Sequence, residues 1–200
     1  MNKKLKNIFL IGPSRAGKTT FAKELCKYGY NHLIMDAVIE TMAECFPESG
    51  IRHGNLESPE FKNFFKSYCK NNFKYGLSYI VDLEVLSPEF AKQLIDKDES
   101  IAIYLGYPSI TPQEKLNQIR TYDTKFDWTK NLSDAELLSM SNKLIATSKT
   151  LKNEAILNDF LFIDTSHNRE EKFKNFINAN LKQNSTLLYR DISSYDKYER

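Results

Sequence analysis

Short apolar runs alternate with longer amphipathic stretches along this chain, and the two patterns predict different elements. Runs of four or five mostly apolar residues, the length of buried strands, occur at 7–11, 32–36, 78–82, 101–105 and 161–164. Between them, apolar side chains recur every three or four residues, as on one face of a helix. Because strands alternate with helices, the sequence predicts an α/β fold in which helices cover both faces of a parallel sheet.

Capping residues mark several of the predicted helix starts. Ser58 and Ser87 each precede a proline, a combination typical of the first turn of a helix. Thr111 and Ser133 each stand three residues before a glutamate, in the pattern of a capping box. The other predicted helices span 19–28, 38–45 and 170–181. Residues 121–132 show neither a helical nor a strand period, so we expect a loop there.

One segment carries a specific chemical signature. The residues Gly12-Pro13-Ser14-Arg15-Ala16-Gly17-Lys18-Thr19 fit the phosphate-loop pattern G-x-x-x-x-G-K-[ST], between the first predicted strand and the first predicted helix. Glycines let the backbone wrap a phosphate, and the N–H groups at the start of the helix donate to it. A turn that binds nothing is the alternative, which the complete strand, loop and helix context disfavours. The sequence therefore predicts a nucleoside triphosphate site.

Roles within this loop follow from the chemistry of its side chains. Lys18 is expected to reach the outer phosphates, and the Thr19 hydroxyl to bind Mg²⁺. Pro13 has no N–H, so the amide donors come from later positions. Arg15 faces either a phosphate or solvent. The predicted nucleotide contacts are Gly12, Ser14, Arg15, Ala16, Gly17, Lys18, Thr19 and Thr20.

Two acids, Asp36 and Asp82, end the second and third predicted strands. In parallel α/β sheets, ligands gather beyond the carboxyl ends of the strands. A carboxylate there repels a triphosphate unless Mg²⁺ or an acceptor proton intervenes. We therefore interpret Asp82 as the acid that orients metal-bound water, and Asp36 as general base or orienting acceptor for an attacking hydroxyl. Helix N-caps are the alternative for both, because each lies near a predicted helix start.

Composition narrows the classes of function. The net charge of +2, from 28 Lys and Arg and 26 Asp and Glu residues, gives no global argument for binding nucleic acid or a membrane. No apolar run approaches membrane-spanning length, and the apolar stretch near the N-terminus leads into the phosphate loop rather than to a cleavage site. The three cysteines lack a C-x-x-C pair, and the three histidines lack metal-ligand spacing. We expect a cytoplasmic protein.

The order of these elements resembles the small P-loop kinases of the adenylate kinase-like fold. That group includes nucleoside monophosphate kinases, shikimate and gluconate kinases, and chloramphenicol phosphotransferase. The resemblance covers about residues 5–182 in layout, although only the phosphate loop is a specific motif. It implies a three-layer α/β/α domain over residues 1–182, with a five-stranded parallel sheet in the order 2-3-1-4-5. Residues 183–200 then form a tail that is either frayed or docked through Leu187, Leu188 and Tyr189.

The same resemblance implies further regions of the site. Residues 37–75 would bind the acceptor, with Arg52 and His53 as its contacts, and residues 120–133 would form a mobile lid. Arg120 would be a catalytic cation near the transferred phosphate. Its alternative is a helix-terminal cation placed favourably in the helix dipole. The loop 164–168 is where this fold would contact the base of the nucleotide.

Departures from the family pattern bear on the acceptor. Nucleoside monophosphate kinases follow the acid of the third strand with Gly-(Tyr/Phe)-Pro-Arg, whereas Asp82 is followed by Leu83-Glu84-Val85. The lid has lysines where those enzymes carry several arginines. Both differences argue against a monophosphate acceptor. An acid at the end of the second strand is instead similar to the hydroxyl-acceptor kinases and the antibiotic phosphotransferase.

The sequence therefore predicts an ATP-dependent kinase that uses Mg²⁺ and transfers the γ-phosphoryl group to the hydroxyl of a small molecule. ATP is expected rather than GTP, because no Asn-Lys-x-Asp follows a strand. One alternative is a regulatory ATPase whose partner senses the bound nucleotide. Another is a polynucleotide or nucleotide kinase that uses a row of lysines, although such a row is usually a solvated helix face. The row consists of Lys62, Lys66, Lys70 and Lys74.

Overall fold

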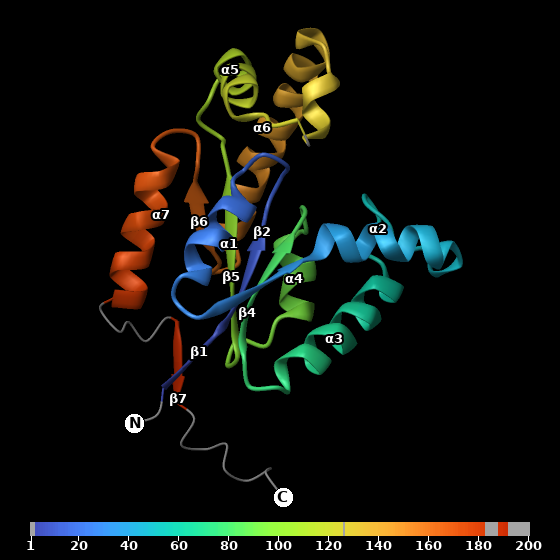
Figure 1. Cartoon of the computed structure of the whole chain (residues 1–200), viewed down its shortest axis with the longest axis vertical. Coiled ribbons are helices and arrows are strands. Elements are labelled where there is room, and N and C mark those ends of the chain that lie inside the picture. The colour runs from blue at the N-terminus through green and yellow to red at the C-terminus, as the bar shows by residue number, and fades with distance from the viewer. Residues whose placement is uncertain (1–2, 126, 183–187, 192–200) are drawn as a thin grey trace, which may run out of the picture.

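Five parallel strands form the central sheet of this computed structural model, which describes residues 3–125, 127–182 and 188–191 (Figure 1). The strands are β2 (Asn7–Ile11), β3 (Tyr30–Ile34), β4 (Ser78–Leu83), β5 (Ser100–Gly106) and β6 (Leu161–Asp164). Their spatial order is β3-β4-β2-β5-β6. In chain order of these five strands this is 2-3-1-4-5, so the predicted sheet is confirmed.

Helices cover both faces of the sheet, because alternate residues of its buried strands point to opposite sides. One face packs against α1 (Lys18–Cys26) and α7 (Arg169–Ile177), through a core that includes Phe21 and Phe173. The other face packs against helices α2 (Met35–Cys45), α3 (Pro59–Phe73) and α4 (Pro88–Leu94). The long helix α6 (Asp134–Leu157) contributes to both cores, with Ile145 in one and Leu151 in the other. The three-layer α/β/α prediction is confirmed.

The predicted caps explain where four helices begin. Ser58 and Ser87 accept hydrogen bonds from the backbone N–H groups of Phe61 and Phe90. Complete capping boxes open α5 (Pro112–Tyr122) and α6. These caps satisfy backbone donors that the first helical turn leaves without partners.

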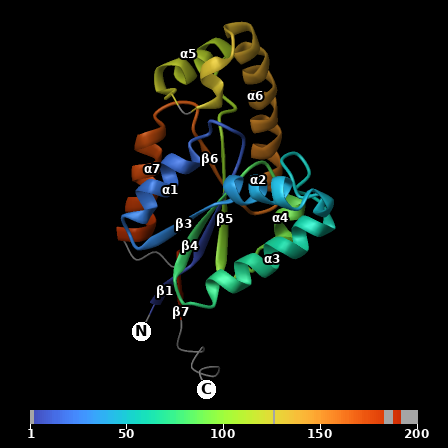
Figure 2. The same ribbon diagram turned by 45° about the vertical axis from the view of Figure 1, so that its right-hand side comes forward.

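A third, smaller core lies above the carboxyl edge of the sheet. Leu116 and Ile119 of α5 pack there against Leu137 of α6. Figure 2 shows α5 and the start of α6 standing over the end of the sheet where α1 and α2 begin. The short 3₁₀ helix η2 (Trp128–Asn131) lies between α5 and α6, and another, η1 (Pro47–Ser49), follows α2. The segment 121–132, predicted as a loop, therefore contains the end of α5 and η2.

The strand predicted at 32–36 is shifted by two residues. Strand β3 ends at Ile34, which pairs with Asp82, and α2 begins at Met35. Met35 and Ile39 are both fully buried, and their i, i+4 spacing needs helical backbone from Met35 onward. Asp36 thus lies in the first turn of α2 rather than at the end of a strand.

A second sheet was not predicted. Strand β1 (Lys3–Leu5) pairs antiparallel with β7 (Tyr189–Asp191). Leu188 is fully buried, and its carbonyl accepts a hydrogen bond of 2.8 Å from the N–H of Lys6. Of the two predicted alternatives, the chain is thus docked at Leu188, and Tyr189 belongs to strand β7. Leu187 and the rest of the predicted tail, 183–187 and 192–200, lie outside the described residues.

The last predicted helix, 170–181, divides into α7 and the π-helix η3 (Asn178–Lys182). Within the described residues, none of the helices combines the length and apolar character that crossing a membrane requires.

Candidate active site

The phosphate loop lies close to β5 and α7, and two of its glycines have no room for a side chain. A Cβ at Gly12 would lie 2.1 Å from the carbonyl oxygen of Leu105, which is backbone and cannot swing away. A Cβ at Gly17, whose φ is +93°, would lie 2.7 Å from Cδ of Arg169. Gly17 is also the residue before α1, so the N–H groups of the first turn face the loop. This is a cradle in which backbone donors can approach a phosphate closely.

Lys18, Thr19 and Asp82 come together at this loop. The ammonium group of Lys18 donates to the carbonyl oxygens of Gly12 and Pro13, at 3.0 and 3.3 Å, and lies 3.9 Å from the Asp82 carboxylate. The Thr19 hydroxyl donates to Asp82 Oδ2 at 2.8 Å. Lys18 and Asp82 are both buried. The buried cation and carboxylate thus stand beside one hydroxyl at the start of α1.

This donor set fits Mg²⁺ bound together with phosphate. Magnesium prefers oxygen ligands and is usually held by one or two carboxylates plus substrate phosphates and water. Thr19 and Asp82 supply a hydroxyl and a carboxylate oxygen 2.8 Å apart. Among the described residues no group of three or more His, Cys, Asp or Glu side chains could hold a metal on its own. Thr19 and Asp82 could therefore hold Mg²⁺ if a bound phosphate supplied further oxygen ligands.

His32, which the sequence analysis did not single out, lies next to Asp82. Its Nε2 is 3.5 Å from Asp82 Oδ2. The register of the parallel pair explains the contact, because β3 and β4 run side by side with Ile34 opposite Asp82. The sequence offered one signal for this contact. His32 lies two residues before Ile34, and alternate strand residues share a face, so His32 lies on the same face of the sheet as Ile34 and its partner Asp82.

Asp36 lies in the first turn of α2, exposed to solvent but surrounded by charged groups of the site. Desolvation raises the pKa of the Asp36 carboxyl, and the Lys18 ammonium opposes that rise. Asp82 and Glu84 raise the pKa further, whereas His53 lowers it. Asp36 is thus close enough to the phosphate-loop lysine and to Asp82 of β4 for their charges to act on its pKa.

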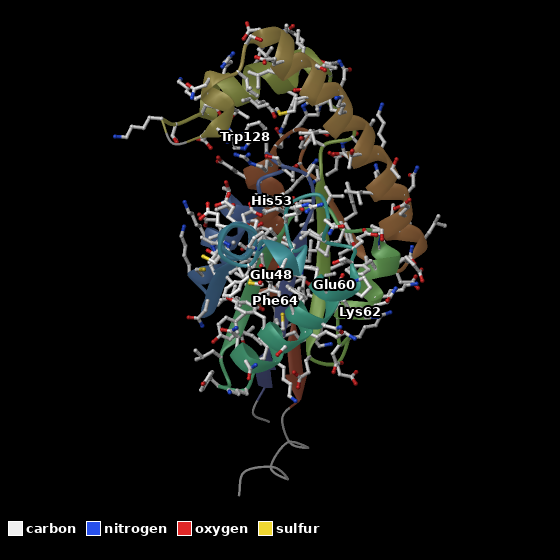
Figure 3. All side chains as sticks on the ribbon, turned by 90° about the vertical axis from the view of Figure 1, so that its right-hand side faces the viewer. Glu48, His53, Glu60, Lys62, Phe64 and Trp128 are labelled. Carbon is white, nitrogen blue, oxygen red and sulfur yellow. The ribbon has the colours of Figure 1, made fainter. Side chains whose placement is uncertain are left out.

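The loop that carries Arg52 and His53 is held by Glu84. One oxygen of Glu84 accepts from the N–H of Gly54 at 3.0 Å, and the other lies 3.1 Å from Nδ1 of His53. Nε2 of His53 is 3.9 Å from Glu40 of α2. Arg52 is exposed, and its guanidinium has no hydrogen-bond or ion-pair partner among the described residues. Figure 3 shows His53 on the same side of the molecule as Trp128, which stands above it.

The Arg15 side chain was predicted to face either a phosphate or solvent, but it faces two carboxylates instead. Its guanidinium forms ion pairs with Asp123 and with Asp127, the latter at 2.6 Å. Asp123 is a fully buried side chain, and Asp127 is about one quarter exposed. Arg15 has a φ of +64°. The phosphate loop is therefore fastened to the segment predicted as the lid.

The backbone of the phosphate loop is held from the same side. The Tyr107 hydroxyl donates to the carbonyl oxygen of Ser14 at 2.8 Å, and the Lys115 ammonium donates to that of Arg15 at 2.9 Å. Lys115 also lies 3.7 Å from the centre of the Tyr107 ring. Burial, together with the charges of Arg169 and Arg15, lowers the pKa of Lys115 to about 7. Neither Tyr107 nor Lys115 stands out as a site residue in the sequence.

Arg120 is engaged within the lid segment. Its guanidinium donates to Asp134 at 2.7 Å and to the carbonyl oxygens of Leu132 and Lys130 at 2.6 and 3.4 Å. These contacts join the end of α5 to the start of α6. The placement of Arg120 near a transferred phosphate stays a prediction.

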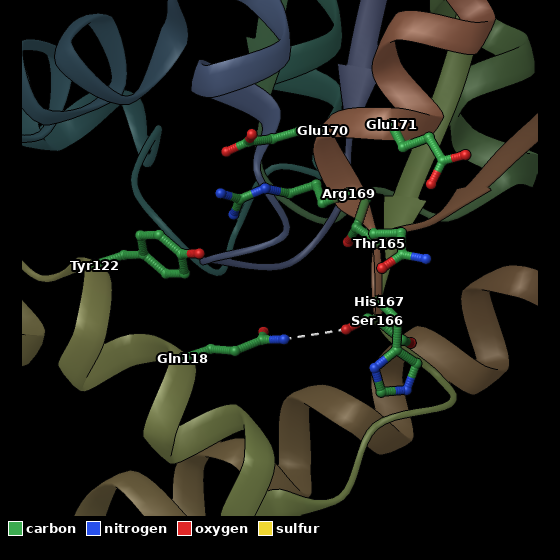
Figure 4. Close-up of a pocket in the computed structure, with 9 residues that line it drawn as sticks. Gln118, Tyr122, Thr165, Ser166, His167, Arg169, Glu170 and Glu171 are labelled. Carbon is green, nitrogen blue, oxygen red and sulfur yellow. Dashed lines mark hydrogen bonds between the residues drawn. The ribbon is translucent and has the colours of Figure 1, made fainter.

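A cavity of about 450 Å³ lies between α5 and the loop from β6 to α7 (Figure 4). Gln118 crosses it to donate to the carbonyl oxygen of Ser166 at 3.1 Å. Arg169 lies 5.5 Å from the Tyr122 ring, and its Nε is buried with no partner among the described residues. The other lining residues are Thr165, His167, Asn168, Glu170 and Glu171. This cavity adjoins the loop 164–168, and Arg169 connects it to Gly17 of the phosphate loop.

The fold defined by these elements matches that of solved kinase structures. Shikimate kinase from Acinetobacter baumannii in complex with shikimate matches with a TM-score of 0.54 and 20% sequence identity, over 90% of this chain and 94% of that one. Shikimate kinase from Bacteroides thetaiotaomicron matches with a TM-score of 0.53 and 16% identity, over 89% and 98%. A sugar kinase from a Janibacter species, in an unliganded structure, matches with a TM-score of 0.54 and 16% identity, over 86% and 92%.

Because these sequence identities are low, the matches establish the fold of the chain and the order of its elements, and no more than that. Neither the comparison with protein-family models nor that with curated protein sequences gives a match. What the site does must therefore be argued from its own residues.

Proposed function

We propose that this protein is an ATP-dependent kinase that transfers the γ-phosphoryl group to a hydroxyl group of a small molecule. The observation that carries the proposal is the meeting of the buried pair Lys18 and Asp82 with Thr19, at an edge where Asp36 interacts electrostatically with the same lysine. A domain that only binds a nucleotide needs just Lys18, Thr19 and Asp82. The fourth group, a carboxylate with a raised pKa, supports an acceptor hydroxyl at this edge.

Each part of the site has a role in this proposal. The amides of the phosphate loop, with Lys18, hold the phosphates. The purine base of the nucleotide occupies the cavity beside Arg169 and Gln118. Thr19 and Asp82 would hold Mg²⁺, which neutralises charge on the phosphates when it is bound.

Asp36 accepts the proton of the attacking hydroxyl, and Arg52 and His53 contact the rest of the acceptor. Arg52 supports this assignment because it is exposed and its guanidinium is without a partner in the described part of the chain. Glu84 positions the loop through Gly54 and His53. Arg120 acts as the catalytic cation only after it leaves Asp134, so we propose that the lid rearranges when both substrates are bound.

Two substitutions test the proposal in an assay of Mg-ATP turnover against a panel of sugars, hydroxy acids, nucleosides and amino alcohols. Lys18→Ala should abolish both ATP binding and transfer. Asp36→Asn should leave ATP affinity within about twofold but lower transfer by about 10²–10⁴-fold, the range for a general base. Full transfer activity in the Asp36 variant would overturn the base assignment. Slow ATP hydrolysis that no acceptor in the panel accelerates would instead support a regulatory ATPase.

A further inference from the structure

A second cavity, of about 460 Å³, lies between α3 and α4, away from the phosphate loop. Its wall includes Gly76, which precedes β4, and Ser100, which begins β5. Both residues mark the amino edge of the sheet, whereas the candidate active site lies at the carboxyl edge. None of the residues that line this cavity lines the first cavity or belongs to the phosphate loop.

The inner wall of this cavity is apolar and uncharged. The Phe9 ring, which is almost fully buried, lies edge-on to the Phe73 ring at 6.3 Å between centres. Leu94 of α4 and Cys69 of α3 complete this wall. Burial raises the pKa of the Cys69 thiol to about 12, so the thiol stays neutral at physiological pH.

The rim of the cavity on the α3 side carries three ammonium groups, from Lys66, Lys70 and Lys74. Lys74 donates to the Asn71 side chain and lies 5.2 Å from the centre of the Tyr75 ring. Lys66 and Lys70 are exposed, and within the described residues neither ammonium group has a hydrogen-bond or ion-pair partner. The fourth lysine of the row, Lys62, differs from both because it donates to Gln93 at 2.8 Å and lies outside the cavity.

From the connection between α4 and β5, Asp96 and Glu99 also line the cavity, so the formal charges of the lining side chains sum to one positive charge. An extended polyanion such as nucleic acid would have to pass these carboxylates. A compact ligand with a single anionic head can stay on the α3 side and meet only the ammonium groups. These charges therefore favour a small monoanion over a polyanion.

We propose that this cavity is a binding site for a small amphipathic monoanion, a medium-chain carboxylate or a carboxylate on a single aromatic ring. The apolar body of the ligand would rest on Phe9, Phe73 and Leu94, with its carboxylate between Lys66 and Lys70. The volume lies within the range of about 300–1,000 Å³ that small-molecule sites occupy. Strand β2 carries Phe9 and continues into the phosphate loop at Gly12, so an occupant contacts the strand that supports the active site without entering it.

The direct test is a titration of the ¹⁵N-labelled full chain with octanoate, followed by amide chemical shifts. The expected result is saturable binding with the largest shifts at Cys69, Gly76 and Ser100. Octanol and octylammonium, which have the same apolar body without the negative charge, should bind more weakly. Shifts confined to the phosphate loop, or weak shifts spread over the whole surface, would overturn the proposal.

Matched variants of one helix separate the charge from the cavity. Lys66→Gln combined with Lys70→Gln should weaken octanoate binding by about fivefold, as expected for the loss of two partly exposed charge contacts. Lys62→Gln, on the same helix but outside the cavity, should change it by less than about 1.5-fold. Equal effects of the two changes would overturn the assignment of the carboxylate to the cavity rim.

A third variant tests the apolar wall. Leu94→Trp places a larger side chain in the cavity and should abolish octanoate binding while all the lysines remain. The thermal unfolding of this variant shows whether it keeps its fold. If it does not fold, the lysine variants decide whether octanoate binds in this cavity. Unaltered octanoate affinity in a folded Leu94→Trp protein would exclude this cavity as the site.

Discussion

The phosphate loop and the lid segment meet at Arg15, but they are held in place by different forces. Backbone geometry fixes the loop: Gly12 lies against the main chain of β5, and buried contacts surround Lys18. The lid segment depends more on side-chain charges, with Arg15 bound to Asp123 and Asp127. Close packing of backbone leaves few alternatives, whereas ion pairs can exchange partners. We therefore expect the loop to be preformed and the lid to be the part that moves.

The largest effect should come from filling the space at Gly12. Gly12→Ala places a methyl group against the Leu105 carbonyl oxygen, so β2 and β5 must separate. We expect a loss of about 3 kcal/mol or more in the free energy of unfolding, measured by urea denaturation.

Gly29→Ala is the control for Gly12→Ala. Gly29 has a φ of +95° but open space where its Cβ would be. Backbone strain alone should then cost about 1 kcal/mol. If the two variants are equally destabilised, the close approach of β5 does not constrain the loop.

A smaller effect is expected when the connection to the lid is cut. Arg15→Gln removes the cation from the buried carboxylate of Asp123, one oxygen of which already lacks a partner among the described residues. We expect a loss of about 1–3 kcal/mol in the free energy of unfolding. Amide hydrogen exchange should accelerate most in 123–131.

A double-mutant cycle with Asp127→Asn separates the two ion pairs of Arg15. The partly exposed pair should contribute a coupling of about 0.5–1 kcal/mol. Exchange rates in the lid that do not respond to Arg15→Gln would show that Arg15 does not hold it.

The last effect concerns the pH dependence of stability. Lys115 has a pKa lowered to about 7 in the folded protein, against the ordinary value of 10.5 in an unfolded chain. Between these values the unfolded chain binds more protons, so the free energy of unfolding should rise with pH, by at most about 1.4 kcal/mol per pH unit.

Lys115→Met should flatten this rise when urea denaturation is compared at pH 7, 8 and 9. Lys149→Met, which changes an exposed lysine of α6, is the control and should leave the slope as it is. A slope that is the same in all three proteins would mean that Lys115 does not titrate in this range.

The contrast between the phosphate loop and the lid segment also explains which features the sequence could predict. The phosphate loop, the five strands and the capped helices depend on neighbours within a few residues, so local patterns identify them. The start of α2 was displaced because Met35 and Ile39 are buried as a helical pair, which an apolar run does not distinguish from a strand.

Contacts between distant segments were harder to predict. Arg15 and Asp123 are 108 residues apart in the chain, and Glu84 lies 30 residues from Gly54. Nothing in the local pattern of charges selects these partners from the many other acids and bases. Lys115 was missed for a similar reason: a lysine on a polar helix is usually exposed, and its burial becomes evident only when Tyr107 and the phosphate loop are in place.

The pairing of β1 with β7 has a practical consequence for handling this protein. Lys3 lies opposite Asp191 in the ladder, so the first and last described residues emerge side by side, at the end of the molecule opposite the lid (Figure 1). A fluorophore or a surface tether attached at either of these two residues would be at the end of the sheet opposite the phosphate loop. A short linker that joins these two positions would also permit circular permutation, with new ends opened in a surface loop.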